Sequence, residues 1–223
     1  SSLGEIALIG HGGSLPGYRN HVLMAPEKGV GVVLLSNREE EALWPALRVL
    51  AALLGQALPA PAEEMPDGLF AAEEGPFWAE LGAGAISFMG GYEKLVSDGS
   101  GGMRSLPAYL DIRLKRSGAD VVEGLIGGVA RRLIRVPDAV PLDPRLPGRW
   151  RDRNLGTEIL IRGDGSARLP WAGSGIETVL KPLPGGRALA DLPHGPWRHR
   201  PCLWLQPDGS LRLAGHRSRI LHF

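Results

Sequence analysis

Between Gly68 and Phe223 the chain consists of short stretches in which apolar and polar residues alternate, and none of them shows helical periodicity. Alternation of this kind puts one side of a strand in a core and the other in solvent, as in antiparallel β-structure. Glycine-containing turns such as Arg162-Gly163-Asp164-Gly165 and Pro207-Asp208-Gly209-Ser210 separate the stretches. Most of the chain is therefore expected to fold into small all-β domains.

Two β regions are predicted, separated by a proline-rich segment. The first runs from Gly68 to about Val136 and the second from Arg145 to Phe223, and the segment from Pro137 to Pro147 carries four prolines. Both regions end with a glycine, then basic residues, then an alternating apolar strand. We interpret this likeness as a weak internal duplication, and we expect two small antiparallel barrels, 68–137 and 147–223, joined by a linker at 138–146.

Residues 1–58 show a different pattern, which predicts a three-stranded sheet covered by a helix. Leucines recur at helical spacing in the last part of this segment, and Gly55 ends the helix. A stiff Pro/Ala/Glu linker follows at 59–67. The expected elements are strand Glu5–Ile9, loop Gly10–Gly17, strand His21–Ala25, turn Pro26–Gly29, strand Val30–Leu35 and a helix that starts near Leu43 and includes Leu47, Leu50 and Leu54.

Charge and cysteine content exclude several classes of function. The formal net charge is +1 and the arginine-rich stretches lack interleaved aromatic residues, so we expect no nucleic-acid partner. No apolar run approaches the ~20 residues that span a bilayer, so no membrane partner is expected. The single cysteine, Cys202, lies in an apolar run and is interpreted as buried filler, and without a Cys/His ligand set we expect neither metal nor cofactor. The lack of paired cysteines favours the cytoplasm and leaves the periplasm open.

The motif that carries chemistry is His11-Gly12-Gly13, within the stretch Gly10-His11-Gly12-Gly13-Ser14-Leu15-Pro16-Gly17. An acyl-transfer site needs a group that holds a substrate carboxylate or a developing charge. A histidine can do this, and it can also move protons near neutral pH. Glycines beside it allow a substrate backbone to approach the strand closely. We therefore take His11 as the candidate catalytic residue and Gly12 and Gly13 as candidate substrate-binding residues.

Residues Ser1 to Leu54 resemble the end of the catalytic domain in serine hydrolases of the class C β-lactamase and penicillin-binding protein family. In that family a His-x-Gly triplet lies on the strand that lines the active site. The resemblance implies an α+β remnant of a β-lactamase-like domain, a three-stranded antiparallel meander plus a helix, ahead of the two barrels. The family nucleophile is the serine of a Ser-x-x-Lys motif, which this chain lacks. The resemblance therefore places the nucleophile in an upstream catalytic segment and implies that this chain alone is inactive.

The two appended β regions resemble those of the D-aminopeptidase branch of this family. In that branch a loop of the last β domain offers a carboxylate to the free amino group of the substrate, and Asp191 is the matching candidate here. The resemblance implies a hydrolase of small D-amino-acid amides, esters or peptides that acts through an acyl-serine. It also leaves homodimer formation open. A plain turn residue is the competing interpretation of Asp191.

A non-catalytic function is the alternative. The β regions would then form a lipocalin-like binding module attached to a degenerate hydrolase domain, with Trp150, Trp171, Trp197 and Trp204 lining a small apolar cavity. Core packing of these tryptophans is the competing interpretation. An intact Ser-x-x-Lys motif upstream would favour the enzyme, and its loss would favour the binding module.

Overall fold

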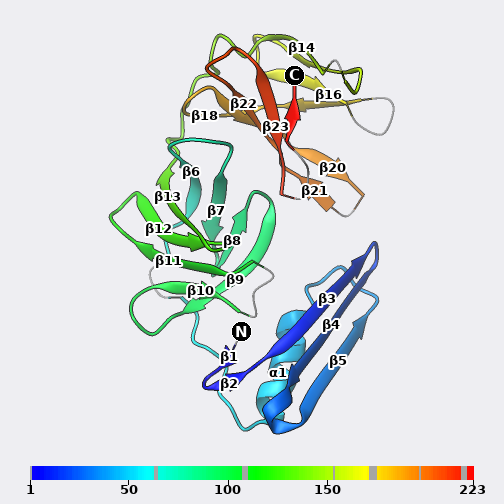
Figure 1. Ribbon diagram of the computed structural model, residues 1–223, viewed down its shortest axis with the longest axis vertical. Coiled ribbons are helices and arrows are strands. Elements are labelled where there is room, and N and C mark those ends of the chain that lie inside the picture. The colour runs from blue at the N-terminus through cyan, green and yellow to red at the C-terminus, as the bar shows by residue number, and fades with distance from the viewer. Residues whose placement is uncertain are drawn as a thin grey trace. The chain divides into compact units, whose positions relative to one another are not determined.

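A computed structural model of the chain describes residues 2–62, 65–106, 110–152, 154–170, 175–195, 197–216 and 220–223. Strands dominate these residues, and the only α-helix among them is α1, Leu43–Leu53 (Figure 1). Contacts divide the chain into two compact units. One comprises Ser1–Met65, Glu93–Lys115 and Gly124–Ala130, and the other comprises Pro66–Tyr92, Arg116–Glu123 and Arg131–Phe223.

The predicted fold class is wrong. An α+β remnant followed by two small barrels was expected, but the described chain is nearly all β and contains one closed barrel, of eight strands. The second β region forms open sheets in place of a second barrel. Alternation in the sequence predicts that a segment is a strand, but it does not say which strands pair. Closure of a barrel depends on such pairing between distant segments.

The N-terminal part contains a two-stranded and a three-stranded antiparallel sheet. β1 (Ser2–Leu3) pairs with β2 (Ile6–Ala7), and β4 (Tyr18–Ala25) lies between β3 (Ile9–Leu15) and β5 (Val30–Ser36). The prediction of a loop at Gly10–Gly17 is therefore wrong for most of its length, because Gly10 to Leu15 belong to β3. Glycine has no strand preference of its own, and here the continuous pairing of β3 with β4 decides the conformation.

A tight turn joins β4 to β5. Its residues Pro26–Lys28 form a 3-10 turn, which ends at Gly29 with a φ of 64°. A positive φ is unfavourable for residues with a Cβ, so glycine is favoured at this position. The turn expected from Pro26 to Gly29 is confirmed.

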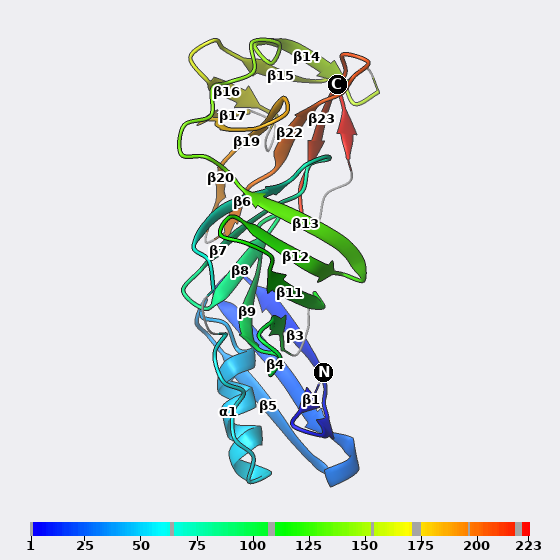
Figure 2. The same cartoon turned by 90° about the vertical axis from the view of Figure 1, so that its left-hand side faces the viewer.

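Helix α1 begins at Leu43, as predicted, and covers one face of the three-stranded sheet (Figure 2). The carboxylate of Glu41 accepts hydrogen bonds from the backbone N–H groups of Leu43 and Trp44, so Glu41 satisfies donors that the first turn leaves free. Gly55 ends the helix with a φ of 63°, as expected.

The core beneath α1 is formed by leucines and alanines of the helix and by the inward-facing residues of β4. Leu47 and Leu50 are fully buried, as is Leu23 on β4. All belong to one cluster. This core lies on the helix side of the sheet alone.

The barrel is an up-and-down arrangement of eight antiparallel strands in which β13 returns to pair with β6. Its core-facing residues include Phe70, Leu81, Ile86 and Leu133, all nearly or fully buried. The strands are β6 (Gly68–Ala72), β7 (Trp78–Gly82), β8 (Ala85–Phe88), β9 (Gly91–Ser97), β10 (Met103–Ser105), β11 (Ile112–Arg116), β12 (Val121–Ile126) and β13 (Val129–Arg135).

The second β region packs a four-stranded and a five-stranded sheet around a core of its own, with a separate hairpin of two strands. The four-stranded sheet is β14 (Gly148–Asp152), β15 (Thr157–Ile161), β16 (Ser166–Leu169) and β17 (Ile176–Val179). The five-stranded sheet is β18 (Lys181–Leu183), β19 (Arg187–Leu189), β22 (Cys202–Leu205), β23 (Leu211–Ala214) and β24 (Leu221–His222). The hairpin is β20 (Leu192–His194) with β21 (Trp197–His199).

A buried arginine joins the second β region to the loop between β6 and β7. Arg187 is 4% exposed, and its guanidinium donates hydrogen bonds to the carbonyl oxygens of Pro184, Ala72 and Gly75 at 2.7, 2.7 and 2.8 Å. These carbonyls satisfy a charge that would otherwise be costly to bury. Arg187 therefore fixes the loop that follows β6.

Candidate functional site

The register of β3, β4 and β5 divides the sheet into two faces. His11 pairs with Val22, which pairs with Val33, so these three residues lie on one face. Their neighbours Gly12, His21 and Leu34 pair in the same way and lie on the opposite face, the one that α1 covers. The motif His11-Gly12-Gly13 therefore presents His11 and Gly13 to one side and Gly12 to the other.

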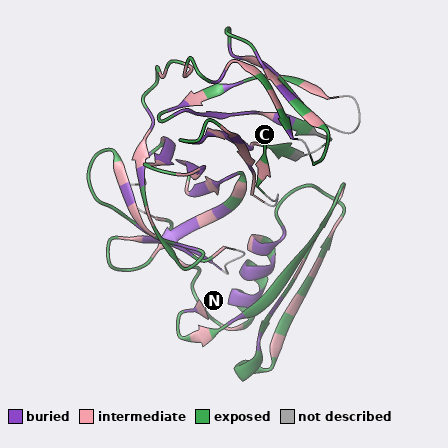
Figure 3. Ribbon diagram, turned by 45° about the horizontal axis from the view of Figure 1, so that its top comes forward, coloured by how far each residue is buried: buried purple, intermediate pink, exposed green. Residues whose placement is uncertain are grey.

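The face that carries His11 is apolar and exposed. Figure 3 shows in green the exposed residues along β3 to β5. His11 itself is exposed. Large exposed side chains share its face, at 58% for Ile9, 38% for Val22, 42% for Met24, 65% for Val33 and 76% for Leu35. An apolar patch of this kind on a sheet marks a surface that contacts something else.

Gly10 and Gly12 have a packing role on the helix face. A Cβ built on Gly10 would lie 2.8 Å from the carbonyl oxygen of Val22 and 3.2 Å from Nε2 of His21, and one on Gly12 would lie 3.3 Å from Nδ1 of the same ring. The imidazole of His21 thus occupies the space above both glycines. We expected a glycine at position 12 in order to allow close approach of a substrate backbone. The structure gives another reason for a glycine there, which is that the ring of His21 needs the space.

Gly13 differs from Gly12. A Cβ there would lie 3.5 Å from Nδ2 of Asn20, an ordinary contact. Gly13 lies on the face that carries His11, two residues along the strand. The absence of a side chain at Gly13 leaves the surface beside His11 open, which suits the substrate-binding role predicted for it.

His21 is a half-buried histidine that the sequence analysis did not single out. Its Nε2 is buried and has no hydrogen-bond partner among the described residues. The pKa of His21 is lowered overall. Burial is the largest cause and lowers it, the nearby Glu41 carboxylate raises it, and His11 lowers it. Only the alternation along β4, which puts His21 on the side of Leu23 and Ala25, could have indicated that it faces the helix.

The turn after the motif is held by an ion pair. Arg19 contacts Glu39 with its guanidinium and donates hydrogen bonds of 3.1 Å to the carbonyl oxygens of Leu15 and Tyr18. The backbone N–H of Gly17 also donates to Glu39. These contacts fix the end of β3, and with it the strand that carries His11.

β3 is an edge strand of its sheet. Among the described strands it pairs with β4 on one side only, and all seven of its residues are exposed. An edge strand presents unpaired N–H and C=O groups, which can add an extended peptide as a further strand. The strand thus combines free backbone groups, a histidine and small neighbours.

Asp191 lies just before β20, in the compact unit that does not contain His11. Its carboxylate accepts a 3.0 Å hydrogen bond from Nε of Arg198 and a second from the terminal nitrogen of the same guanidinium. Its backbone carbonyl accepts a 3.0 Å hydrogen bond from the hydroxyl of Thr178. The ion pair raises the pKa of Arg198. The carboxylate that was predicted to bind an ammonium group therefore already has a cation as its partner.

The tryptophans of the alternative interpretation can be placed in part. Trp171 lies outside the described residues, as does the side chain of Trp197. Trp150 packs against the core of the second β region and donates a 2.8 Å hydrogen bond to the carbonyl of Leu146. The guanidinium of Arg212 lies 5.5 Å from the ring of Trp204.

Cys202 is fully buried, as predicted. Burial raises the pKa of its thiol to about 12, so the thiol is protonated and unreactive near neutral pH.

A groove of about 360 Å³ lies on the second β region and is lined by Arg149, Glu158, Leu160, Arg168, Leu169, Pro170 and Gly175. None of the predicted site residues lines it. In the described part of the chain, no group of three or more His, Cys, Asp or Glu residues is arranged to hold a metal ion. No helix in the described part is long and apolar enough to cross a membrane.

No known protein family matches the sequence, and neither does any curated protein. Among solved structures, the chain is similar to the octameric penicillin-binding protein homologue from Pyrococcus abyssi, with 16% sequence identity and a TM-score of 0.22. The similarity covers 96% of this chain and 33% of that chain, so this chain spans about a third of the length of its neighbour.

Proposed function

We propose that this chain is part of a serine hydrolase, in which β3 lines an acyl-transfer site. The observation that carries the proposal is an exposed histidine, His11, on an edge strand, with Gly13 on the same face, where a side chain would meet only Asn20 at ordinary contact distance. This combination offers backbone groups that pair with an extended substrate and a side chain that donates or moves a proton. The resemblance of residues 1–54 to penicillin-binding serine hydrolases supports it.

The proposed steps need little from this chain beyond positioning. The backbone of a small peptide or amide pairs with the free edge of β3, and Gly13 leaves room for the substrate beside His11. The imidazole of His11 donates a hydrogen bond to the substrate carboxylate or to the charge that develops during acyl transfer. Arg19 and Glu39 keep the end of the strand in place.

The nucleophile is proposed to come from an upstream catalytic segment, because no Ser-x-x-Lys motif occurs in residues 1–223. In this proposal residues 1–58 contribute the strand that carries His11, and 68–137 and 147–223 are the appended β domains, with linkers at 59–67 and 138–146. The apolar face formed by Val22, Val33 and Leu35 gives an upstream segment a surface to pack on.

The proposed substrates are small amides, esters or peptides with a free N-terminal D-residue. Asp191 is the candidate partner for the substrate ammonium. Since Arg198 occupies its carboxylate, binding of an ammonium requires Asp191 to share or release that arginine. Replacing Arg198 with alanine should then lower the KM of an amino substrate and leave the KM of its N-acetyl derivative unchanged.

The test uses the protein with its upstream segment. Release of p-nitrophenol from p-nitrophenyl acetate reports acyl transfer, and release of ammonia from D-alanine amide reports the substrate class. His11→Ala should lower kcat for both, by about 10²-fold or more if the imidazole acts in the transition state. Val49→Ala, on the exposed side of α1, is the control and should leave kcat unchanged.

Failure on both substrates by a protein with an intact Ser-x-x-Lys motif would end the hydrolase proposal. Hydrolysis of the ester without hydrolysis of D-alanine amide would remove only the D-amino-acid substrate class. Homodimer formation through the β domains belongs to the same proposal, and sedimentation velocity tests it.

A second candidate function is a binding module, and the closed eight-stranded barrel favours it. Up-and-down barrels of eight strands have an interior that is filled by side chains or holds one small ligand. Loss of the Ser-x-x-Lys motif upstream, together with ligand binding by the β regions, would support this function over the enzyme.

A further inference from the structure

We infer that one end of the barrel, around Arg131, binds the carboxylate group of a small organic acid. The starting point is the register of the strands. Arg135 pairs with Phe70, Phe70 pairs with Ala79, and Ala79 pairs with Phe88, so these side chains share the core-facing side of the barrel sheet. Side chains alternate along β13, which puts Arg131 on the same side as Arg135 and the fully buried Leu133.

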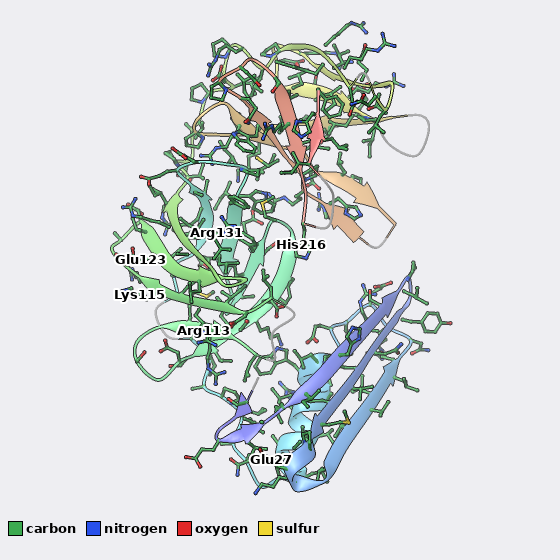
Figure 4. All side chains as sticks on the ribbon, in the orientation of Figure 1. Glu27, Arg113, Lys115, Glu123, Arg131 and His216 are labelled. Atoms are coloured by element: carbon green, nitrogen blue, oxygen red, sulfur yellow. The ribbon has the colours of Figure 1, made fainter. Side chains whose placement is uncertain are left out.

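Arg131 is held against aromatic rings. The carbon at the centre of its guanidinium lies 3.5 Å from the ring centroid of Phe77 and 5.7 Å from that of Phe88. The two rings are parallel, with centroids 6.3 Å apart. Figure 4 labels Arg131 within the barrel. A guanidinium stacked on an aromatic face keeps its N–H donors in the plane of the fork, where a carboxylate accepts them.

The arginine has no acidic partner among the described residues. Burial lowers its pKa and no carboxylate opposes that effect, while its Nε is buried without a hydrogen-bond partner. Two other arginines of the same strand are both paired. Arg132 contacts Glu73 at 3.1 Å, and Arg135, which stacks on Phe70, contacts Asp120 at 2.8 Å.

A comparison of Arg131 with Arg135 indicates that Arg131 lacks an anionic partner. Both are core-facing arginines stacked on a phenylalanine, four residues apart on β13, and only Arg135 has a carboxylate. A half-buried arginine without an anion is unfavourable, because desolvation of the charge is not offset. An external carboxylate at Arg131 would supply the contact that Asp120 supplies at Arg135.

The loop that carries Phe77 is fixed before any ligand binds. The N–H of Ala72 donates a 2.9 Å hydrogen bond to the carbonyl of Phe77, which closes the loop. Arg187 binds the carbonyls of Ala72 and Gly75 in the same loop. A preformed site loses less conformational freedom on binding than a mobile one.

One guanidinium carries a single positive charge, which one carboxylate neutralises through two parallel N–H···O hydrogen bonds. The adjacent phenylalanines favour an acid with a flat apolar body. The inference does not depend on the hydrolase proposal, because Arg131 and His11 belong to different compact units.

The test is titration of the full chain with 3-phenylpropionate, followed by the ¹⁵N and ¹H signals of the arginine Nε–H groups. The Nε–H signal of Arg131, assigned by its absence in Arg131→Lys, should shift on titration, with affinity in the millimolar range or tighter. The neutral 3-phenylpropanamide and inorganic phosphate should leave it in place. Acetyl-alanyl-alanine with a free or an amidated C-terminus shows whether a peptide carboxylate serves as well as a free acid.

Arg131→Met should weaken binding by about tenfold or more, whereas Arg132→Met, a change at the next residue on the outer face, should leave it within about twofold. Equal binding by Arg131→Met, an unmoved Nε–H signal in the unaltered protein, or equal binding of the amide would overturn the inference. Equal binding of phosphate would overturn the choice of a carboxylate. If Arg131→Met does not fold, the signal in the unaltered protein decides alone.

Discussion

The sheet formed by β3, β4 and β5 and the barrel formed by β6 to β13 are both antiparallel, but they differ in how they cover their apolar side chains. The barrel closes on itself and encloses residues such as Phe70 and Leu133 without a second layer. The open sheet has α1 on one face, and its other face leaves Val33 and Leu35 at 65% and 76% exposure. An antiparallel sheet can leave one face in water, but that face is then usually polar. The difference marks the face of His11 as an apolar surface that stays exposed in the described part of the chain.

The largest effect should come from the covered face of the open sheet. Leu47→Ala removes a fully buried side chain between α1 and the sheet and should lower the stability of this region by about 2–5 kcal/mol. Amide hydrogen exchange in β4 measures the loss region by region. Val33→Ala, on the uncovered face, is the control and should cost less than about 0.5 kcal/mol. An equal loss for both variants would mean that the two faces are equally covered.

In the barrel, the next largest effect on stability should come from Arg187. Arg187→Met leaves the carbonyls of Ala72, Gly75 and Pro184 without their buried donor and should destabilise the barrel by about 2–3 kcal/mol, as measured by hydrogen exchange in β6. The control is Arg149→Met. It breaks a 2.7 Å pair with Glu158 on an exposed face, where about 0–1 kcal/mol is expected. A loss no larger than that of the control would show that Arg187 does not hold the loop.

A smaller effect, and one confined to the open sheet, should follow from pH. Burial keeps the pKa of His21 below its ordinary value of 6.5 in the folded protein, so the unfolded chain binds the proton more readily. Stability of this sheet should therefore fall as the pH falls through about 6.5, and it should level off once the folded protein is also protonated. Stability of α1 and β4 against pH is the measurement.

The control for the pH effect is His21→Asn, which keeps a polar side chain of moderate size but does not titrate. Its stability should lose this pH dependence, while Glu41 and His11, which act electrostatically on His21, are present in both proteins. An unchanged profile would mean that His21 does not cause the dependence.

Charges introduced on the uncovered face should have the smallest effect on stability. They should have a clear effect on binding of a hydrophobic dye. Val33→Lys combined with Leu35→Lys replaces two exposed apolar side chains and should change stability by less than about 0.5 kcal/mol. Binding of a hydrophobic dye should fall, because the apolar patch is divided. Unaltered dye binding would locate the exposed apolar surface elsewhere in the chain.

Local elements of the fold were predictable where side-chain spacing is unambiguous. The leucines at helical spacing gave the start of α1 at Leu43, and Gly55 gave its end. The alternating strand expected at the end of the first β region is β13. The stretch Gly10 to Leu15 was missed as a strand, because glycines carry no pattern and its conformation depends on the neighbouring β4.

The sequence suggested residues for the candidate site but not their geometry. His11, Gly12 and Gly13 were proposed from their order in the sequence, and only the register showed that Gly12 faces the opposite side, under His21. The sequence also drew attention to Asp191 but could not show that Arg198 pairs with it. Arg131 stood in a row of basic residues in which nothing distinguished the paired from the unpaired ones.

By itself the sequence indicated that most of residues 68–223 form strands, where the one predicted helix lies and that Cys202 is buried, because these follow from the local alternation or spacing of apolar residues. Only the tertiary structure decided that one β region closes into a barrel and the other does not, which face of β3 is exposed, and which charges are paired. Each of these depends on contacts between residues far apart in the chain, and the free energy of such contacts is set by pairing and packing that no local pattern records.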